Sequence, residues 1–404
     1  MLLNEMGKEE ILDRASKHYF SLGVDDGAAS LCKENFKYGL AKIHLTQEYL
    51  GMTPNATFIS TPDETISRNT ARWISGYGYG GKLVWGDKND SVLFIDTKPN
   101  ACGMLVGGLE EMPEPDRIIK NISEIYESEL FLDNIQIKMD SKKGNHFIDV
   151  FKTDKFSIRD RGFPPYMFVI HGSCPELRGE TEKGSGIYYD KSKTLREQCK
   201  EYKTPFGVSL YLEGTSALEF MRFFEYAKQF AAQKRELIAE RLFGKYTKIS
   251  NPMHQGMLNV NSILLGAQHI SEEHNKIYPV CLRGDLPTYI VQTVPNLTEE
   301  QIDRLGFENR AKKFDVMHRL KEFNAIPHGG GYELIGINRV IKIIEINGER
   351  FYVCEQETED AVTILSDPTD TEYLYRGKKI INKIEALKLG TVISKLYPRF
   401  VLKI

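Results

Sequence analysis

Apolar side chains recur every three or four positions in several segments of the chain, and this spacing predicts helices. The clearest segment is 216–243, where aromatic and aliphatic residues are interleaved with charged ones along its length. The same spacing predicts helices over 9–20, 27–51, 114–129, 299–323 and 378–389. We expect each helix to pack an apolar face against neighbouring elements.

Short apolar runs bounded by glycine, proline and asparagine predict strands between these helices. The predicted strands lie at 77–86, 91–96, 97–108, 134–140, 144–151, 166–172, 277–282, 287–294, 340–346, 350–356 and 400–404. No internal repeat and no low-complexity linker interrupts the pattern. A domain boundary is therefore not visible in the sequence.

Composition narrows the class of protein. The 404 residues include 53 basic and 56 acidic groups, and 41% are apolar, which excludes disorder, collagen and coiled coil. No run of about 18 apolar residues occurs, and the first residues lack the basic-then-apolar order of a signal peptide. The six cysteines are scattered without a CxxC pair. We expect a soluble intracellular protein without disulfides.

Charge is unevenly distributed along the chain. Segment 376–404 carries eight basic residues against one acid, a local charge of +7, whereas the net charge of the chain is −3. Such a segment is a candidate track for nucleic-acid phosphates. The alternative is a solvated helix face balanced by acidic neighbours such as 114–129. The sequence alone leaves both interpretations open.

The nine histidines fall into two groups. Five belong to predicted helices or polar segments and are predicted to be solvated or hydrogen-bonded surface residues: His18, His44, His269, His274 and His318. The other four lie at strand ends or in loops, where a side chain can point into a cleft: His146, His171, His254 and His328.

One cysteine and the second group of histidines are candidate metal ligands. Cys102 follows a predicted strand and precedes Gly103. A thiolate with several imidazoles is a donor set for a divalent transition metal. The spacing along the chain does not show that these side chains meet.

His328 precedes three glycines in the sequence Ile-Pro-His-Gly-Gly-Gly. Residues without a Cβ let the backbone approach a ligand closely, so this imidazole could attack a phosphorus atom without crowding. The alternative is a glycine-rich turn with a solvent-facing histidine. The motif by itself does not separate the two.

Taken in order, these motifs resemble those of the RtcB-type RNA ligases, the 3′-phosphate or tRNA-splicing ligases. The matching segments span almost the whole chain. They are CGM at 102–104, GNHFIDV at 144–150, VIHGS at 169–173, QKRELI at 233–238, the loop around His254, PVCLRGDLPTYIV at 279–291, PHGGG at 327–331 and KLYPRFVLK at 395–403.

The resemblance implies a fold and an activity. The fold would be α+β, with stacked sheets flanked by helices around one metal and nucleotide cleft. Residues 1–404 would form a single catalytic domain, to whose nucleotide and RNA site segment 376–404 contributes. The activity would be GTP- and Mn²⁺-dependent joining of RNA 2′,3′-cyclic phosphate or 3′-phosphate ends to 5′-hydroxyl ends, in cytoplasmic RNA repair or tRNA splicing. No membrane is involved, and the need for an activating accessory protein stays open.

The resemblance also assigns roles to residues. One or two Mn²⁺ ions would be held by Cys102, His146, His171 and His254. His328 would be the guanylylated residue, with Gly329 and Gly330 beside the nucleotide. Three further residues would contact the nucleotide: Asn145 at a phosphate, and Asp149 and Lys403 at the guanine base.

Three positions depart from the family pattern. Pro99 replaces an aspartate ligand of the metal site, and Asp96 is the nearest candidate to take over that role. Tyr332 replaces an arginine that contacts phosphate. Segment 283–287 replaces the nucleotide-binding glycine-serine-methionine-glycine loop and brings in the carboxylate of Asp285. Two alternatives therefore stay open, a metal-dependent phosphoesterase or nucleotidyl-transfer relative without the sealing step, and a non-catalytic protein that binds RNA ends.

Overall fold

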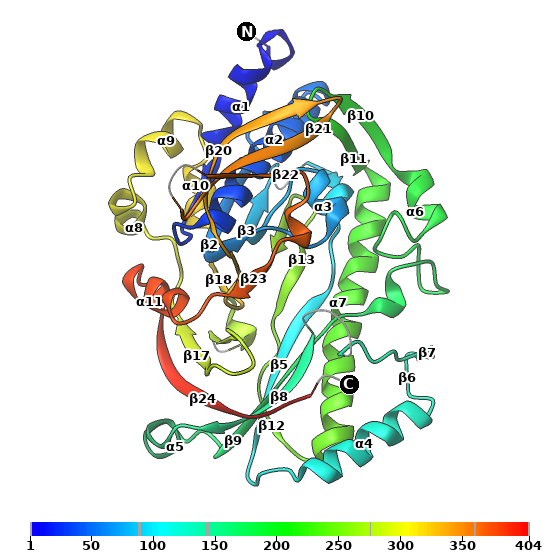
Figure 1. The fold of residues 1–404 in the computed structure, drawn as a ribbon. Helices are drawn as coiled ribbons and strands as arrows, with labels where there is room; N and C mark the ends of the chain where they lie inside the picture. The colour runs from blue at the N-terminus through cyan, green and yellow to red at the C-terminus, as the bar shows by residue number, and fades with distance from the viewer. Residues whose placement is uncertain (1, 88–89, 142–145, 275, 359–360, 403–404) are drawn as a thin grey trace.

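The largest element of the structure is a curled, 12-stranded sheet. The computed structural model describes residues 2–87, 90–141, 146–274, 276–358 and 361–402. In spatial order the sheet contains β1 (Tyr19–Phe20), β2 (Thr57–Thr65), β3 (Tyr79–Val84), β14 (Ser262–Leu265), β13 (Met253–Asn259), β5 (Cys102–Leu109), β9 (Tyr166–Gly172), β8 (Phe147–Thr153), β24 (Gly390–Leu402), β17 (Thr288–Thr293) and β16 (Ile277–Val280), with β12 (Thr247–Ser250) beside β5. Figure 1 shows this sheet with helices around it, so the predicted α+β class is confirmed.

The middle of the sheet brings distant segments into register. β9 pairs antiparallel with both β5 and β8, so that His171 lies opposite Met104 on one side and opposite Phe147 on the other. The start of β5, the start of β8 and the end of β9 therefore meet at the same end of these three paired strands.

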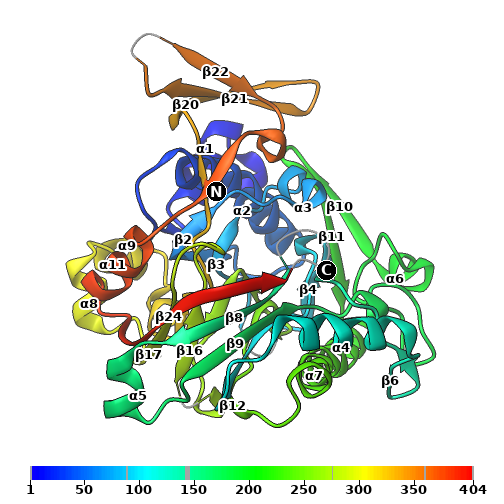
Figure 2. The same ribbon diagram turned by 60° about the horizontal axis from the view of Figure 1, so that its bottom comes forward.

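Long helices cover the sheet. α7 (Thr215–Phe243) matches the prediction for 216–243, and its aromatic residues Phe220, Phe224 and Phe230 are buried in the core. It packs against β5, β9 and β13 and beside α4 (Pro115–Glu127), as Figures 1 and 2 show. α2 (Gly27–Tyr49) confirms the prediction for 27–51 and packs against β2.

Other predicted helices are shorter than expected. Segment 299–323 forms three helices, α8 (Glu299–Arg304), α9 (Glu308–Lys313) and α10 (Met317–Lys321). Left-handed backbone at Gly306 (φ 68°) and Asp315 (φ 54°) separates them. α1 (Lys8–Ser16) ends before His18, because the next residues form β1, which pairs in parallel with β2.

The N-terminal histidines are also placed differently from the prediction. His18 and His44 are fully buried, with ring centroids 4.6 Å apart, so the expectation of surface positions was wrong for both. The apolar and aromatic residues of β1 and α2 pack in the core, and both histidines are buried together with them.

Smaller sheets complete the fold. β4 (Val92–Phe94) pairs with the hairpin β10 (Lys200–Thr204) and β11 (Gly207–Glu213). Two-stranded pairs are formed by β6 (Phe131–Leu132) with β7 (Ile135–Gln136), β15 (Ala267–His269) with β18 (Ala325–Pro327), and β19 (Tyr332–Leu334) with β23 (Tyr373–Tyr375). The remaining short helices are α3 (Thr70–Ile74), α5 (Lys155–Arg161), α6 (Lys193–Gln198) and α11 (Lys379–Ala386).

A three-stranded sheet stands away from the main body. It contains β20 (Ile337–Ile346), β21 (Glu349–Gln356) and β22 (Val362–Leu365), and Figure 2 shows it above α1 and α2. Its inner face buries Tyr352 and Cys354, whereas Ile344 and Ile364 are exposed. In the part of the chain that the structure describes, none of the helices is long and apolar enough to cross a membrane.

Candidate functional site

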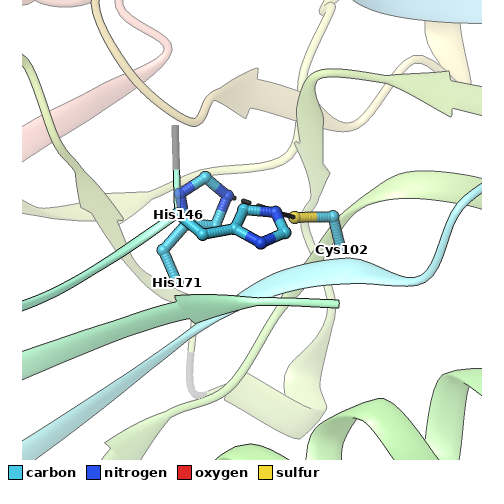
Figure 3. Close-up of side chains that lie close together, drawn as sticks. All are labelled: Cys102, His146 and His171. Carbon is cyan, nitrogen blue, oxygen red and sulfur yellow. Dashed lines mark hydrogen bonds between the residues drawn. The ribbon is translucent and has the colours of Figure 1, made fainter. Parts of the chain in front are cut away.

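A cluster of one thiol and two imidazoles lies at the end of the sheet where the starts of β5 and β8 meet the end of β9. The Sγ atom of Cys102 lies 3.2 Å from Nε2 of His146 and 3.1 Å from Nε2 of His171 (Figure 3). The three potential ligand atoms lie within 4.8 Å of one another. Sulfur with two imidazole nitrogens is a donor set that suits a divalent transition metal. Three of the four predicted ligands are thus brought together.

Backbone geometry explains why the cysteine is followed by glycine. A Cβ on Gly103 would lie 2.6 Å from both Nη2 of Arg235 and the carbonyl oxygen of Pro252. Arg235 is buried on α7, where it donates to Asn251 and to the Gly172 carbonyl. Glycine therefore lets α7 and β13 approach the strand that carries Cys102.

The cluster continues into a row of imidazoles. Nε2 of His171 lies 3.2 Å from Nε2 of His254, and the ring of His254 stacks on that of His328 with centroids 4.5 Å apart. We call His146, His171, His254 and His328 the histidine row. His254 lies in β13 and not in a loop as predicted. The register of β13 against β5 shifts between Met253 and Gln255, and such bulges redirect a side chain.

A buried carboxylate orients His328. Nδ1 of His328 lies 3.1 Å from Oδ2 of Asp63 and 2.8 Å from the carbonyl oxygen of Gly266. Both partners are acceptors, so Nδ1 is the nitrogen that donates a proton to them and Nε2 points away from them. Asp63 is 1% exposed and belongs to β2. Its role was not predicted from the sequence, where it is a single carboxylate in segment 57–65.

The three glycines after His328 lie close to neighbouring backbone. A Cβ on Gly329 would lie 2.7 Å from the Cys281 carbonyl oxygen, and one on Gly330 would lie 2.4 Å from that of Arg376. Gly331 has φ 63° and a similar clash with the backbone of Asp63. Neighbouring backbone occupies the positions that Cβ atoms would take, so the glycines permit tight packing of the loop.

The basic C-terminal segment is only partly available. Arg376 is fully buried, where its Nε and Nη2 atoms donate to Asp26 at 2.7 and 2.6 Å. Lys379 pairs with Glu333. Lys388 and Lys395 are exposed, and Lys403 lies outside the described residues. Arg376 is therefore not available to bind nucleic-acid phosphates, and the ion pair of Lys379 reduces its availability for such binding.

A second carboxylate supports His146 from behind. Oδ2 of Asp140 lies 2.9 Å from Nδ1 of His146 and accepts hydrogen bonds from the backbone and the hydroxyl of Ser173. Lys234 of α7 lies 3.9 Å from Asp140 and forms a buried ion pair with Glu176 at 2.8 Å. This network directs Nε2 of His146 toward Cys102, as expected for a carboxylate behind a metal-binding imidazole.

Protonation differs along the histidine row. Burial lowers the pKa of His146, but its interactions with Cys102 and Asp140 outweigh burial and raise that pKa to about 10. Burial, with the charges of other histidines, holds the pKa values of His171 and His254 well below the usual range. The cluster without an ion is thus a proton-bearing His146 beside neutral imidazoles, and a bound metal ion would take the place of that proton.

Two cavities flank the row. The first, of about 190 Å³, is lined by His328 with Gly329 and Gly330, and also by Phe147, Asp149 and Tyr375. We call it the glycine-loop cavity. The second, of about 340 Å³, opens on Cys102 and His146, and we call it the thiol-side cavity. Tyr79 lines both, and its ring centroid is 5.6 Å from that of His328.

The structure also places the departures from the family pattern. Asp96 does not approach Cys102, because its carboxylate accepts from Lys42 at 2.5 Å and from the Tyr77 hydroxyl, so the idea that it replaces the missing ligand was wrong. Asp285 is exposed and paired with Arg283. Tyr332 lines the glycine-loop cavity. Asn145 lies outside the described residues.

Comparison with known proteins adds no assignment. Neither the protein-family models nor the curated proteins contain a match to this chain. The resemblance to RtcB-type ligases therefore rests on the motifs and on the site that they form.

Proposed function

We propose that this protein is a GTP- and Mn²⁺-dependent RNA ligase that joins a 3′-phosphate or 2′,3′-cyclic phosphate end to a 5′-hydroxyl end through a guanylylated His328. The observation that supports this most is the orientation of His328. Its Nδ1 faces Asp63 and the Gly266 carbonyl, and its ring stacks on a row that leads to the Cys102 cluster. An imidazole held in a fixed orientation beside a candidate cation site is the arrangement that nucleotidyl transfer through histidine requires.

The steps of the proposed reaction are those that the resemblance to RtcB-type ligases implies. Nε2 of His328 attacks the α-phosphorus of GTP, a P–N bond forms, and pyrophosphate leaves with the electron pair of the broken P–O bond. An oxygen of the RNA 3′-phosphate then attacks the same phosphorus and restores the imidazole. The 5′-hydroxyl finally attacks the activated 3′-phosphate and loses its proton to solvent, and GMP leaves with the electron pair of the broken P–O bond. A 2′,3′-cyclic end is first opened by water, which breaks the bond from phosphorus to the 2′-oxygen and leaves a 3′-phosphate. Asp63 holds the Nδ1 proton and stabilises the positive charge on the ring during attack.

Cys102, His146 and His171 would hold the ion, with His254 next to them in the histidine row. A divalent ion there supplies positive charge that offsets the phosphate oxygens. The three donor atoms fit one transition-metal ion by type and by spacing. Asp63 and Asp140 lie behind His328 and His146, so both rings stay oriented whether or not an ion is bound.

Guanine selection is assigned to Asp149. This residue is 5% exposed on β8 and lines the glycine-loop cavity with Phe147 and Tyr375. A carboxylate can accept from both N1–H and the 2-amino group of guanine, whereas adenine offers neither donor on that edge. Aromatic walls suit a planar base.

The test is label transfer to the protein. The purified chain is incubated with Mn²⁺ and GTP labelled in the α-phosphate, and we expect an acid-labile, alkali-stable label, as for a phosphorus–nitrogen bond. His328→Ala should abolish the label, whereas His318→Asn, at a half-exposed site on α10, should keep it. A folded wild-type protein that takes up no label with Mn²⁺ would remove the ligase proposal.

A second candidate function is favoured by the Asp96 ion pair. With Pro99 in the family's aspartate position and Asp96 held by Lys42, the described residues offer a carboxylate-free donor set that fits one ion. One ion could activate water to open a 2′,3′-cyclic phosphate without joining ends. Conversion of a cyclic end to a 3′-phosphate that requires Cys102 but not GTP or His328 would favour this candidate over the ligase.

A further inference from the structure

The thiol-side cavity has a lining unlike that of the glycine-loop cavity. Besides Cys102 and His146 it is lined mainly by polar side chains. Three of these are the carboxamides of Asn69, Asn100 and Gln255, and two others are Arg178 and Tyr188. The carboxamides come from three separate parts of the chain, the start of α3, the loop before β5, and β13. Nothing in the motif analysis pointed to this group.

The carboxamide oxygens are all engaged inside the protein. Oδ1 of Asn69 accepts from the backbone of Arg72 at 3.0 Å as the cap of α3, and Oδ1 of Asn100 accepts from the backbone of Ala101 at 3.0 Å. Oε1 of Gln255 accepts from the Tyr79 hydroxyl at 3.2 Å.

This leaves the three NH₂ groups as free donors. Among the described residues none of them has an acceptor, although Asn100 and Gln255 are each only 7% exposed. The cavity therefore presents hydrogen-bond donors with their orientation already fixed.

Arg178 adds a positive charge to these donors. Its side chain has no carboxylate partner in the described part of the chain, and the one side-chain hydrogen bond found there is long, 3.4 Å from Nη2 to the Ser173 hydroxyl. Its Nε is buried without a hydrogen-bond partner, and its guanidinium lies 5.3 Å from the ring centroid of Tyr188. An unpaired guanidinium beside fixed amide donors is suited to an anion with several acceptor oxygens.

Among the described residues of the lining, Asp140 is the one carboxylate, and its partners already compensate its charge. It accepts from His146 and Ser173, and Lys234 lies 3.9 Å away. Among the described residues, Tyr79 alone lines both cavities, and its hydroxyl donates to Gln255. An anion held among these donors would thus be next to the metal cluster and one side chain away from the His328 cavity.

We propose that the thiol-side cavity binds the terminal phosphate of an RNA strand, as a 3′-phosphate or a 2′,3′-cyclic phosphate, with Arg178, Asn69, Asn100 and Gln255 as its donors. The inference rests on the proposed ligase function. It separates the two substrates in space, the nucleotide in the glycine-loop cavity and the strand end in the thiol-side cavity. It also supplies a positive charge for phosphate recognition from a region where the sequence motifs indicated none.

The test compares two fluorescein-labelled RNA decamers of one sequence, ending in a 3′-phosphate or a 3′-hydroxyl, by anisotropy with the full chain and Mn²⁺. We expect the wild type to prefer the phosphate end roughly tenfold, the size of one charge-assisted contact. Arg178→Ala should reduce the preference to near unity. Asn69→Asp keeps an oxygen to cap α3 but replaces the donor with a negative charge, and should also abolish it.

Controls make each outcome decisive. Arg159→Ala removes an exposed arginine on α5 that pairs with Asp160, and should leave the preference unchanged. Retention of the preference in both Arg178→Ala and Asn69→Asp would overturn the proposal. Displacement of both RNAs by millimolar inorganic phosphate alone would assign the cavity to free phosphate and overturn it as well. Absence of label on His328 refutes the ligase function separately, because the binding assay does not depend on guanylylation.

Discussion

Two groups of buried histidines occupy opposite chemical environments in this protein. His18, just after α1, and His44, on α2, pack against each other, and Nη1 of Arg14 lies 3.2 Å from a ring nitrogen of each. The histidine row instead has the Cys102 thiol beside His146, Asp140 behind it, and Asp63 behind His328.

The difference shows what turns buried imidazoles into a candidate site. Burial, followed by the charges of Arg14 and Arg319, lowers the pKa of His18 to about 3, so this pair is neutral and has cations for neighbours. Around His146 the anionic neighbours outweigh burial and raise its pKa to about 10. Anionic neighbours allow a cation to be held, whereas arginines repel one. Burial of histidine alone therefore does not define a metal site.

The strongest test of this contrast is removal of the thiol. Cys102→Ser should weaken Mn²⁺ binding more than 100-fold and abolish guanylylation, because the hydroxyl is not ionised at neutral pH and is a poor ligand. His44→Asn should leave ion affinity unchanged although it disturbs a buried pair. Calorimetric titration with Mn²⁺ checks both. Equal loss of affinity in the two variants would mean that the contrast in charge does not decide ion binding.

A smaller loss is expected at the carboxylate that orients His328. Asp63→Asn should slow label transfer from GTP about 100-fold, because the buried amide no longer stabilises a positive ring or fixes its tautomer. Mn²⁺ affinity should stay within twofold, since Asp63 does not approach Cys102. The measurement is the initial rate of guanylylation. An unchanged rate would remove Asp63 from the mechanism.

The His18 and His44 pair should make folding stability depend on pH. The folded pKa of His18, about 3, lies below its ordinary value of 6.5, so between these values the unfolded chain binds more protons and stability falls as pH falls. From pH 7 to pH 5 the expected loss is about 2 kcal/mol from His18 alone. Urea unfolding at a series of pH values measures it. His18→Gln should flatten this slope, and an equally steep slope in that variant would contradict the assignment.

The smallest effect is expected behind His146. Asp140→Asn should weaken Mn²⁺ binding about tenfold, the range seen for residues that support a metal ligand. Asp13→Asn, at an exposed site on α1, is the matched control. Cobalt absorption spectra follow the same change and report the geometry at the sulfur. An affinity equal to that of the control would show that Asp140 does not position His146.

Several features of the fold were predictable because they depend on local pattern. The periodicity of 216–243, 27–51 and 114–129 specified α7, α2 and α4, whose apolar faces are long enough to dominate short-range preferences. Segment 299–323 was not predicted correctly, because its apolar spacing continues across two turns that only the backbone angles at Gly306 and Asp315 reveal.

The sequence by itself determined the chemistry that this protein can offer: a thiol, four candidate imidazoles and a glycine-rich loop in a recognisable order. Only the tertiary structure decided that Cys102, His146 and His171 meet, because strands 44 and 69 residues away must align in register. The contacts of Asp63 with His328 and of Asp140 with His146, and the burial of His18 and His44, are likewise visible only in the tertiary structure. The physical reason is that ligand geometry and burial depend on which distant segments pack together. The residues adjacent to a side chain in the sequence do not specify which distant segment packs against it.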